Sequence, residues 1–509
     1  PPIAYSIKNH APSIVLAPQC SIHYLITSRS SHTQPTTTMH RATIVGVVAL
    51  IGVLLVGGGV RAQPPQRFDY PAARAPTTWA NTDAGLPHHV VYTDGSVARV
   101  AVLRLNPAGY GPSYAFGFFC TGHGAAPCAD FLLGVAVVYS NSGALITSTT
   151  TGVPQVVWSA NRGSPLGEGA AAELTPEGDL VLRSANGSAV WSAGTKGRSV
   201  AGVTIGSDGN LVLLDGRNAT VWQSFDHPTD ALLVGQSLGH GARLTANTSA
   251  ADWRDGRFYL AVEDDALSAY VNATPPQRYY HLGFGETAAG AHATYTNGSL
   301  TVSARPGAPS LATIQLPTVV AGTVQYMRLE HDGHLRLYEW RSGSGWAPVF
   351  DVLRLFPDGG CAYPTVCGAY GVCTDDTQCS CPDAANFRAV DFRRPNRGCV
   401  PTNPPATSCD SSSRGQRAQH RLVSLPGTGY FNDHATSMRA MERVSEEACK
   451  KACLDDCACA AAQFYYGRDA GDGFCYLQSE VFSLQTVRTE VVHYNSTMRI
   501  KVQAKSARI

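Results

Sequence analysis

Short apolar runs alternate with polar positions and glycine-containing turns through most of the chain, a pattern typical of antiparallel β-strands. Its clearest part holds one phrase three times, as VWSA at 157–160, VWSA at 190–193 and VWQS at 221–224. A unit of about 30 residues with one tryptophan cannot bury that side chain alone. The repeat therefore predicts three small antiparallel sheets around a shared tryptophan core. The alternative is a chance spacing inside an ordinary β-sandwich.

Similar strand signals continue after this repeat. Two copies of a second phrase, GDLVL at 178–182 and GNLVL at 209–213, separate the tryptophan phrases. The later segment HDGHLRLYEW at 331–340 has the same pattern of a glycine-containing turn followed by a strand-like run. Three further tryptophans, Trp253, Trp340 and Trp346, are expected to serve as core residues there. The pattern thus predicts a first β-domain over 76–234 and a second one of the same kind over 235–356.

The N-terminal residues carry a targeting pattern. Residues 1–38 show no periodicity, and we interpret them as an extension outside the mature protein. Met39 opens a basic segment, which an apolar run and small residues follow, as in a secretory signal peptide over 39–62. The mature chain is then expected to begin at Gln63. A retained signal anchor is the alternative, but the apolar run is shorter than the ~20 residues that a membrane span needs.

Composition narrows the class of protein. The 509 residues are 15% charged with a net charge of +1, and they include 50 glycines and 31 prolines, as suits a turn-rich β protein. Without a basic block, nucleic acid is not an expected partner. Of the 15 cysteines, 12 fall between Cys361 and Cys475, which predicts disulfide-stapled modules formed in an oxidising compartment. Cys120 and Cys128, with no other cysteine nearby, are expected to pair. Six N-x-S/T sequons agree with secretion: Asn186, Asn218, Asn247, Asn272, Asn297 and Asn495.

Two long strings carry a family resemblance. VVWSANRGSPL at 156–166 and VWQSFDHPTDALL at 221–233 closely resemble the bulb-type, mannose-binding lectin domain of plant S-locus glycoproteins and lectin receptor-like kinases. The resemblance implies a mainly β protein with two tandem three-sided β-prism domains, in agreement with the repeat count. It also implies an EGF-like module over 357–402 and an α+β PAN/apple module over 405–503.

The resemblance also implies how the C-terminal cysteines pair. In the EGF-like module the matching pairs are Cys361–Cys373, Cys367–Cys379 and Cys381–Cys399. In the PAN module they are Cys449–Cys475 and Cys453–Cys459, which leaves Cys409–Cys457. Zinc is the alternative for such closely spaced cysteines, but the spacing is not that of two CxxC knuckles, so no metal and no cofactor are expected. Ser445 is expected to cap a helix that begins with two glutamates.

In the lectin family, mannose binds to the strand pattern Gln-x-Asp-x-Asn-x-Val-x-Tyr. Residues two apart project from one face of a strand, so three polar side chains can reach neighbouring sugar hydroxyls. The second copy keeps three of the five positions, Asp208, Asn210 and Val212, while the first copy (175–183) keeps only Val181. The second domain keeps Asp332 and Tyr338. The sequence therefore predicts a weak or altered sugar site; the alternative is that these residues only form hairpin turns.

Catalysis is not expected. The sequence holds no G-x-S-x-G or H-E-x-x-H motif and no phosphate-binding loop. The cluster DHPTD at 226–230 is typical of a turn. The chain is interpreted as a secreted or cell-surface glycoprotein at the cell wall or plasma membrane that binds mannose-type glycans. One alternative is protein–protein recognition, including homo- or hetero-dimerisation through the EGF-like and PAN modules. Another is that the chain is the ectodomain part of a receptor-like Ser/Thr kinase.

Overall fold

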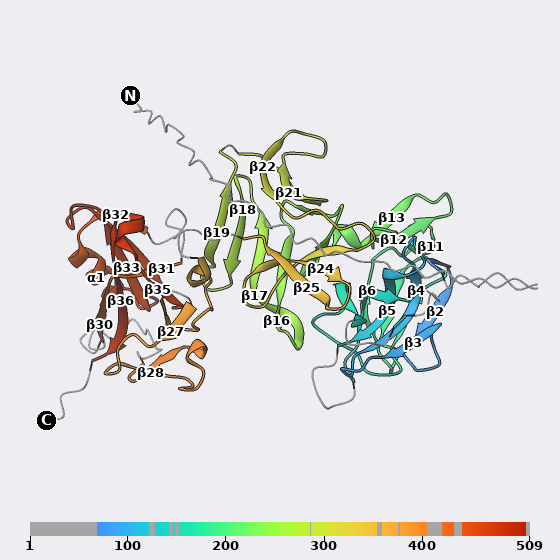
Figure 1. Cartoon of the computed structure of the whole chain (residues 1–509), viewed down its shortest axis with the longest axis horizontal. Coiled ribbons are helices and arrows are strands. Elements are labelled where there is room, and N and C mark those ends of the chain that lie inside the picture. The colour runs from blue at the N-terminus through green and yellow to red at the C-terminus, as the bar shows by residue number, and fades with distance from the viewer. Residues whose placement is uncertain are drawn as a thin grey trace, which may run out of the picture. The chain divides into compact units, whose positions relative to one another are not determined.

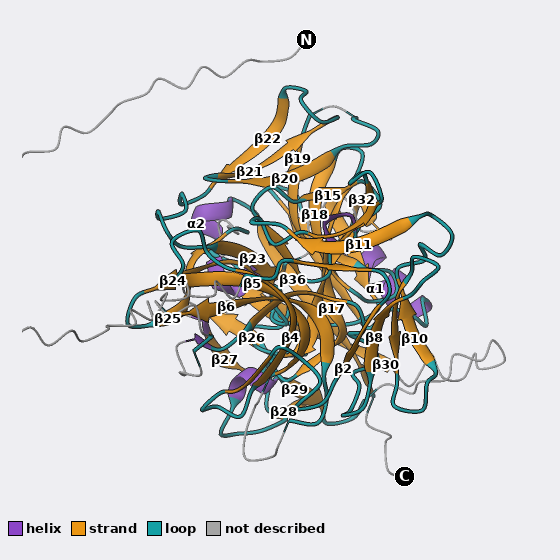
Figure 2. Ribbon diagram, turned by 90° about the vertical axis from the view of Figure 1, so that its right-hand side faces the viewer, coloured by secondary structure: helices purple, strands orange, loops and turns teal. Residues whose placement is uncertain are grey.

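The computed structural model describes residues 69–121, 128–141, 146–147, 152–285, 287–353, 359–374, 377–404, 420–431 and 440–504. The expected extension (1–38), signal peptide (39–62) and cleavage site before Gln63 lie outside these ranges and stay predictions. Residues Pro65–Ile509 form one compact unit. Its described part is mainly β, as predicted, with only two short α-helices among many strands (Figure 2).

Three antiparallel sheets contain the tryptophan repeat (Figure 1). The first has the order β3 (His88–Val91), β4 (Val97–Arg104), β5 (Gly111–Cys120), β6 (Leu132–Ser140), β7 (Gln155–Ser159). The second has the order β10 (Ala189–Ser192), β9 (Leu180–Arg183), β8 (Ala171–Leu174), β2 (Thr77–Ala80). The third has the order β1 (Ala72–Arg74), β11 (Val200–Ile205), β12 (Leu211–Asp215), β13 (Thr220–Gln223).

The three repeated tryptophans meet in the middle of these sheets. Trp158, Trp191 and Trp222 come from β7, β10 and β13, so each sheet contributes one. Their ring centroids lie 5.7–6.0 Å apart in edge-to-face pairs, an arrangement that aromatic rings favour. The Trp158 indole also donates to the backbone carbonyl of His227 at 2.9 Å. The repeat in the sequence thus corresponds to three sheets that share one aromatic cluster.

Three further four-stranded antiparallel sheets follow. One has the order β14 (Ala231–Leu233), β23 (Gln325–Leu329), β24 (Leu335–Arg341), β25 (Gly345–Asp351). Another has the order β15 (Ser237–Gly239), β20 (His292–Thr296), β21 (Ser299–Ser303), β22 (Ser310–Gln315). The last has the order β16 (Arg243–Ser249), β17 (Asp252–Val262), β18 (Ala266–Val271), β19 (Gln277–Gly283). Strand β14 falls within the stretch assigned to the first domain, yet it pairs with β23 of this second group.

The tryptophans expected in the second core lie elsewhere, and this corrects the sequence prediction. Trp253, Trp340 and Trp346 are only half-buried, whereas the second core is filled by smaller aromatic and aliphatic side chains such as Phe258 and Tyr295. Trp340 instead stacks on Tyr139 of β6, with ring centroids 4.4 Å apart. Trp346 and Trp253 likewise pack against core clusters of the first group of sheets.

The cysteine-rich part forms three small sheets, and one of them combines strands from both predicted modules. In the four-stranded sheet the order is β27 (Gln378–Ser380), β26 (Val372–Thr374), β35 (Leu484–Thr486), β31 (Thr428–Tyr430). A hairpin joins β28 (Phe387–Ala389) to β29 (Cys399–Pro401). The five-stranded sheet has the order β30 (His420–Pro426), β36 (Asn495–Gln503), β33 (Ala461–Tyr466), β34 (Gly473–Gln478), β32 (Ala440–Val444). Since β26 pairs with β35, the predicted 357–402 and 405–503 modules are joined by backbone hydrogen bonds.

The helix predicted after Ser445 is α1 (Glu446–Asp455), and the Ser445 hydroxyl accepts from the Ala448 amide at 3.3 Å. A second, one-turn helix is α2 (Thr489–Val492). Cys449 and Cys453 share the buried face of α1, where they pack with Phe464 of β33. The spacing of four residues placed both cysteines on one side of the helix, as expected.

Six disulfide bonds link described residues: Cys120–Cys128, Cys361–Cys373, Cys367–Cys379, Cys381–Cys399, Cys449–Cys475 and Cys453–Cys459. All six are the expected pairs. Cys457 is exposed and forms no disulfide with any cysteine of the described ranges. Its expected partner Cys409 lies outside the described residues, so the seventh bond is not present in the described part and stays a prediction.

Candidate functional site

The best-matching strand copy lies in a hairpin turn. The Gly206 amide donates to the Asn210 carbonyl at 2.9 Å, and β12 begins only at Leu211. Asp208 and Asn210 therefore precede the strand, and they do not share a strand face with Val212 as the spacing suggested. Gly209 at the turn has φ +85°, and a Cβ there would lie 2.6 Å from ring carbon Cε1 of Tyr114. Only glycine fits this position, for conformational and for steric reasons.

The Asn210 side chain is occupied by the protein itself. It is 8% exposed, and its amide donates to Gln223 Oε1 at 2.8 Å. Its carbonyl oxygen accepts from the Ser224 hydroxyl and from the Phe225 amide, both at 3.2 Å. These bonds tie the turn to β13 and to the 3₁₀ turn η2 (Ser224–Asp226). Because each polar atom of the side chain already has a partner, Asn210 is a structural residue.

The first copy contains the same arrangement. Asp179 is also buried and directly precedes its strand, β9. Its carboxylate accepts from the Ser192 hydroxyl at 2.6 Å and from the Thr195 amide at 3.0 Å. The polar residue before each aliphatic strand thus holds the turn against the next segment of the repeat.

Asp208 is the exposed member of the group. Its Oδ1 accepts from the Asn210 amide at 3.0 Å, a local turn contact. Its charge lies near Tyr114 of β5, whose pKa is raised by burial and by this carboxylate. The Tyr114 phenol therefore keeps its proton at physiological pH and can donate a hydrogen bond. Val212, in β12, is half-buried opposite Gln223 of β13.

The polar groups of the second-domain candidates, Asp332 and Tyr338, also have partners within the protein. The Asp332 carboxylate pairs with Arg336 at 2.8 Å, and the Tyr338 hydroxyl donates to Glu330 Oε1 at 2.7 Å. The Tyr338 ring stacks on Tyr326, with centroids 5.1 Å apart. Asp332 and Tyr338 therefore make contacts within this sheet, and a sugar that used their polar groups would have to replace these contacts.

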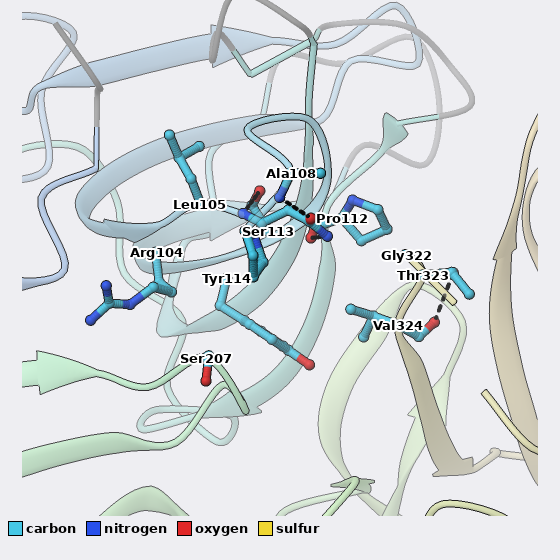
Figure 3. Close-up of a pocket in the computed structure, with 12 residues that line it drawn as sticks. Arg104, Leu105, Ala108, Pro112, Ser113, Tyr114, Ser207, Gly322, Thr323 and Val324 are labelled. Carbon is cyan, nitrogen blue, oxygen red and sulfur yellow. Dashed lines mark hydrogen bonds between the residues drawn. The ribbon is translucent and has the colours of Figure 1, made fainter. Parts of the chain in front are cut away.

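A hollow of about 400 Å³ lies beside the Asp208 turn. Its walls come from the β4–β5 connection, from Ser207 and from the segment 322–324 before β23. Figure 3 shows Tyr114 extending from β5 between Ser207 and Val324. Tyr114 is only 7% exposed, and no described residue forms a hydrogen bond with its hydroxyl.

Sequence reasoning missed this hollow. Nothing in the strand-like pattern around Tyr114 links it to Ser207, about 90 residues later, or to Val324, more than 200 residues later. The packing of two separate groups of sheets creates the hollow, so no local signal could have found it.

The remaining candidates have clear positions. The cluster DHPTD is structural: the ring of His227 stacks on Trp222 at 5.2 Å, and buried Asp230 pairs with Arg328 at 3.0 Å. Five of the predicted glycosylation asparagines are exposed, and Asn247 is half-buried. No helix in the described ranges is long and apolar enough to cross a membrane.

Comparison with known proteins gives the class. Residues 155–254 match the D-mannose binding lectin family, and they span the tryptophan repeat and the Asp208 turn. The resemblance seen in the sequence is thereby confirmed for this segment, and the chain as a whole is similar to plant G-type lectin S-receptor-like kinases and EP1-like glycoproteins.

Several relatives show how much of the chain is shared. It is 26% identical to a G-type lectin S-receptor-like serine/threonine-protein kinase of Arabidopsis thaliana, over 69% of this chain and 39% of the kinase. It is 29% identical to EP1-like glycoprotein 1 of Arabidopsis thaliana, over 62% of this chain and 74% of that protein. The chain thus spans well under half of the kinase's length.

Solved lectin structures also match parts of the chain. A monomeric monocot mannose-binding lectin from Gastrodia elata is 12% identical, covering 30% of this chain and 96% of that one, with a TM-score of 0.16. The two-domain fetuin-binding agglutinin of Scilla campanulata is 17% identical, covering 41% and 85%, with a TM-score of 0.19.

Proposed function

We propose that this chain is a non-enzymatic, extracellular recognition glycoprotein that binds a neutral glycan at the Asp208 turn. The observation that carries the proposal is the exposed Asp208 carboxylate beside the hollow lined by Ser207 and Tyr114. The family match supports a lectin role in the same segment. The architecture we propose is two tandem three-sided prisms followed by EGF-like and PAN modules, in agreement with the sheet orders and the disulfide pairs.

The hollow suits a hydroxylated ligand better than a charged one. Tyr114 supplies a protonated phenol, Ser207 a hydroxyl and Asp208 a carboxylate, which together offer donors and acceptors to sugar hydroxyls. Pro112 and Val324 supply apolar wall for the CH face of a sugar ring. Since few direct hydrogen bonds form, we expect a dissociation constant of about a millimolar, near −4 kcal/mol. Several such contacts on one branched glycan would add by multivalency.

Binding to immobilised mannan and to a glycan array tests the proposal. Asp208→Asn keeps the turn contact to the Asn210 amide but removes the charge, and Tyr114→Phe removes only one hydroxyl. We expect each variant to weaken binding several-fold, because each removes one hydrogen-bonding partner of the sugar. Glu177→Gln is the matched control, since Glu177 occupies the equivalent exposed position of the first copy and does not line the hollow.

Two results would contradict this assignment. Unchanged mannan binding by both Asp208→Asn and Tyr114→Phe would place the sugar elsewhere, with the strand bearing Asp332 and Tyr338 examined next. A wild-type protein that binds no glycan at millimolar concentration would favour the second candidate function, protein–protein recognition. That candidate is supported by Asn210, Asp332 and Tyr338, whose polar groups are already used within the protein. Analytical ultracentrifugation would then test for dimers formed through the cysteine-rich modules.

A further inference from the structure

The loop between β28 and β29 is a rigid, exposed projection that the glycan proposal does not use. It joins the two strands of a short hairpin (Figure 1), and the bond Cys381–Cys399 fixes its C-terminal end. The Asp391 carboxylate accepts from the Arg393 amide at 3.0 Å, and the Val390 amide donates to the Gly398 carbonyl at 2.9 Å. A one-turn 3₁₀ helix, Pro395–Arg397, completes the loop. Such a loop loses little conformational entropy when it binds a partner.

Four arginines and one phenylalanine lie exposed on this loop and on the end of β28 that leads into it: Arg388 on β28, and Arg393, Arg394, Arg397 and Phe392 on the loop. Phe392 is 81% exposed, which is the highest value among the large exposed apolar side chains of the described residues. Four arginines against one aspartate give residues 388–397 a formal charge of +3, whereas the whole chain carries +1. Within the described ranges, no acidic side chain forms an ion pair with any of the four. The charge of the loop is therefore free for an external partner.

We infer that this loop binds a carboxylated polysaccharide. The planar guanidinium pairs with a carboxylate through two parallel hydrogen bonds, and a polymer with a carboxylate on each sugar can meet several arginines at once. The Arg393 guanidinium lies over the ring of Phe392 at 5.3 Å, which leaves the other ring face for the CH surface of a sugar. The inference stands apart from the neutral-glycan site, since the loop and the hollow share no residue.

The structure favours this partner over a membrane or an acidic protein. Inserting Phe392 into hydrocarbon would carry the guanidinium of Arg393 with it, and burying an unpaired charge is costly. A stable protein interface needs ~20–30 residues on each side, and the loop offers only about ten. A charged polymer does not need such an area, because successive weak contacts on one chain add together.

Binding to polygalacturonate, measured by surface plasmon resonance with the full chain, tests the inference. Fully methyl-esterified polygalacturonate is the ligand control, because it keeps the sugar backbone without the charge. We expect binding to the acid form only, falling as salt rises toward 0.5 M, since ions screen exposed charges. Charge reversal in Arg393→Glu/Arg394→Glu should weaken binding about tenfold or more, and Phe392→Ala a few-fold.

The matched control is Arg305→Glu/Arg468→Glu, which makes the same change in net charge at two other exposed arginines. It should bind as the wild type does. Equal losses in both double variants would show a nonspecific charge effect and overturn the inference. So would equal binding of the methyl ester, binding only to phosphatidylserine vesicles, or no binding to polygalacturonate. Mannan binding by the same variants should not change, which separates this test from that of the neutral-glycan site.

Discussion

Replacing Asn210 by alanine should destabilise the first group of sheets, whereas the same change at Asp208 should not. Asn210→Ala removes three hydrogen bonds and leaves the Phe225 amide and the Gln223 carbonyl oxygen without that partner. A net hydrogen bond contributes about 0.5–1.5 kcal/mol, and an orphaned buried group costs about 1–3 kcal/mol. We therefore expect a loss of about 2–4 kcal/mol in unfolding free energy. Asp208→Ala loses one exposed turn contact and should cost under about 1 kcal/mol.

Tryptophan fluorescence reports on this change directly, because Trp222 lies on β13, which Asn210 ties to the turn. Urea unfolding should show the first fluorescence transition at lower urea for Asn210→Ala and at the wild-type position for Asp208→Ala. Asn210→Asp is a useful third variant, since Asp179 fills the equivalent position in the first copy; it keeps the two acceptor contacts and should fall between the others. Equal transitions for Asn210→Ala and Asp208→Ala would refute the structural role of Asn210.

Three further predictions follow from the structure. Cys453→Ser should lower secretion and thermal stability, as losing a disulfide in a small module typically costs about 2–5 kcal/mol; wild-type yield would contradict this. Maleimide should label Cys457 only after reduction, as the predicted Cys409–Cys457 bond requires; labelling of the native, unreduced protein would contradict that bond. Burial raises the pKa of Asp332, but Arg336 and other contacts outweigh this and lower it overall. The Asp332 contribution to stability should therefore be present near neutral pH and lost as pH falls below about 4. Asp332→Asn should flatten that acid dependence in pH-dependent urea unfolding.

Local patterns in the sequence predicted much of the fold. The tryptophan phrases located one strand in each of three sheets, because a bulky side chain recurring every 30 residues has to share a core with its copies. Ser445 and the two following glutamates located α1 through capping chemistry. Five of the disulfide pairs came from family resemblance, and Cys120–Cys128 came from the absence of other cysteines nearby; all six are present.

Pairings between distant segments were not predictable. Residues 72–74 precede the first domain predicted from the sequence (76–234), yet they form β1 at the edge of the third sheet. Strand β14 follows the last tryptophan phrase without a break, but it pairs with β23 nearly 100 residues later. The parallel pairing of β26 with β35 is equally distant. Strand pairing depends on backbone hydrogen bonds that any sequence can make, so residue types alone do not specify which distant strands pair.

The candidate site shows why its residues were only partly predictable. Asp179 and Asn210 occupy the same repeat position, both are buried, and both bond to the segment that carries the next tryptophan. The fold requires a polar side chain there whether or not a sugar binds. A match to the lectin pattern at this position therefore carries no information about binding. The informative positions are the exposed ones, Glu177 and Asp208, and only Asp208 lies beside the hollow that Tyr114 lines. A binding difference between variants of these two residues would thus measure ligand recognition separately from folding.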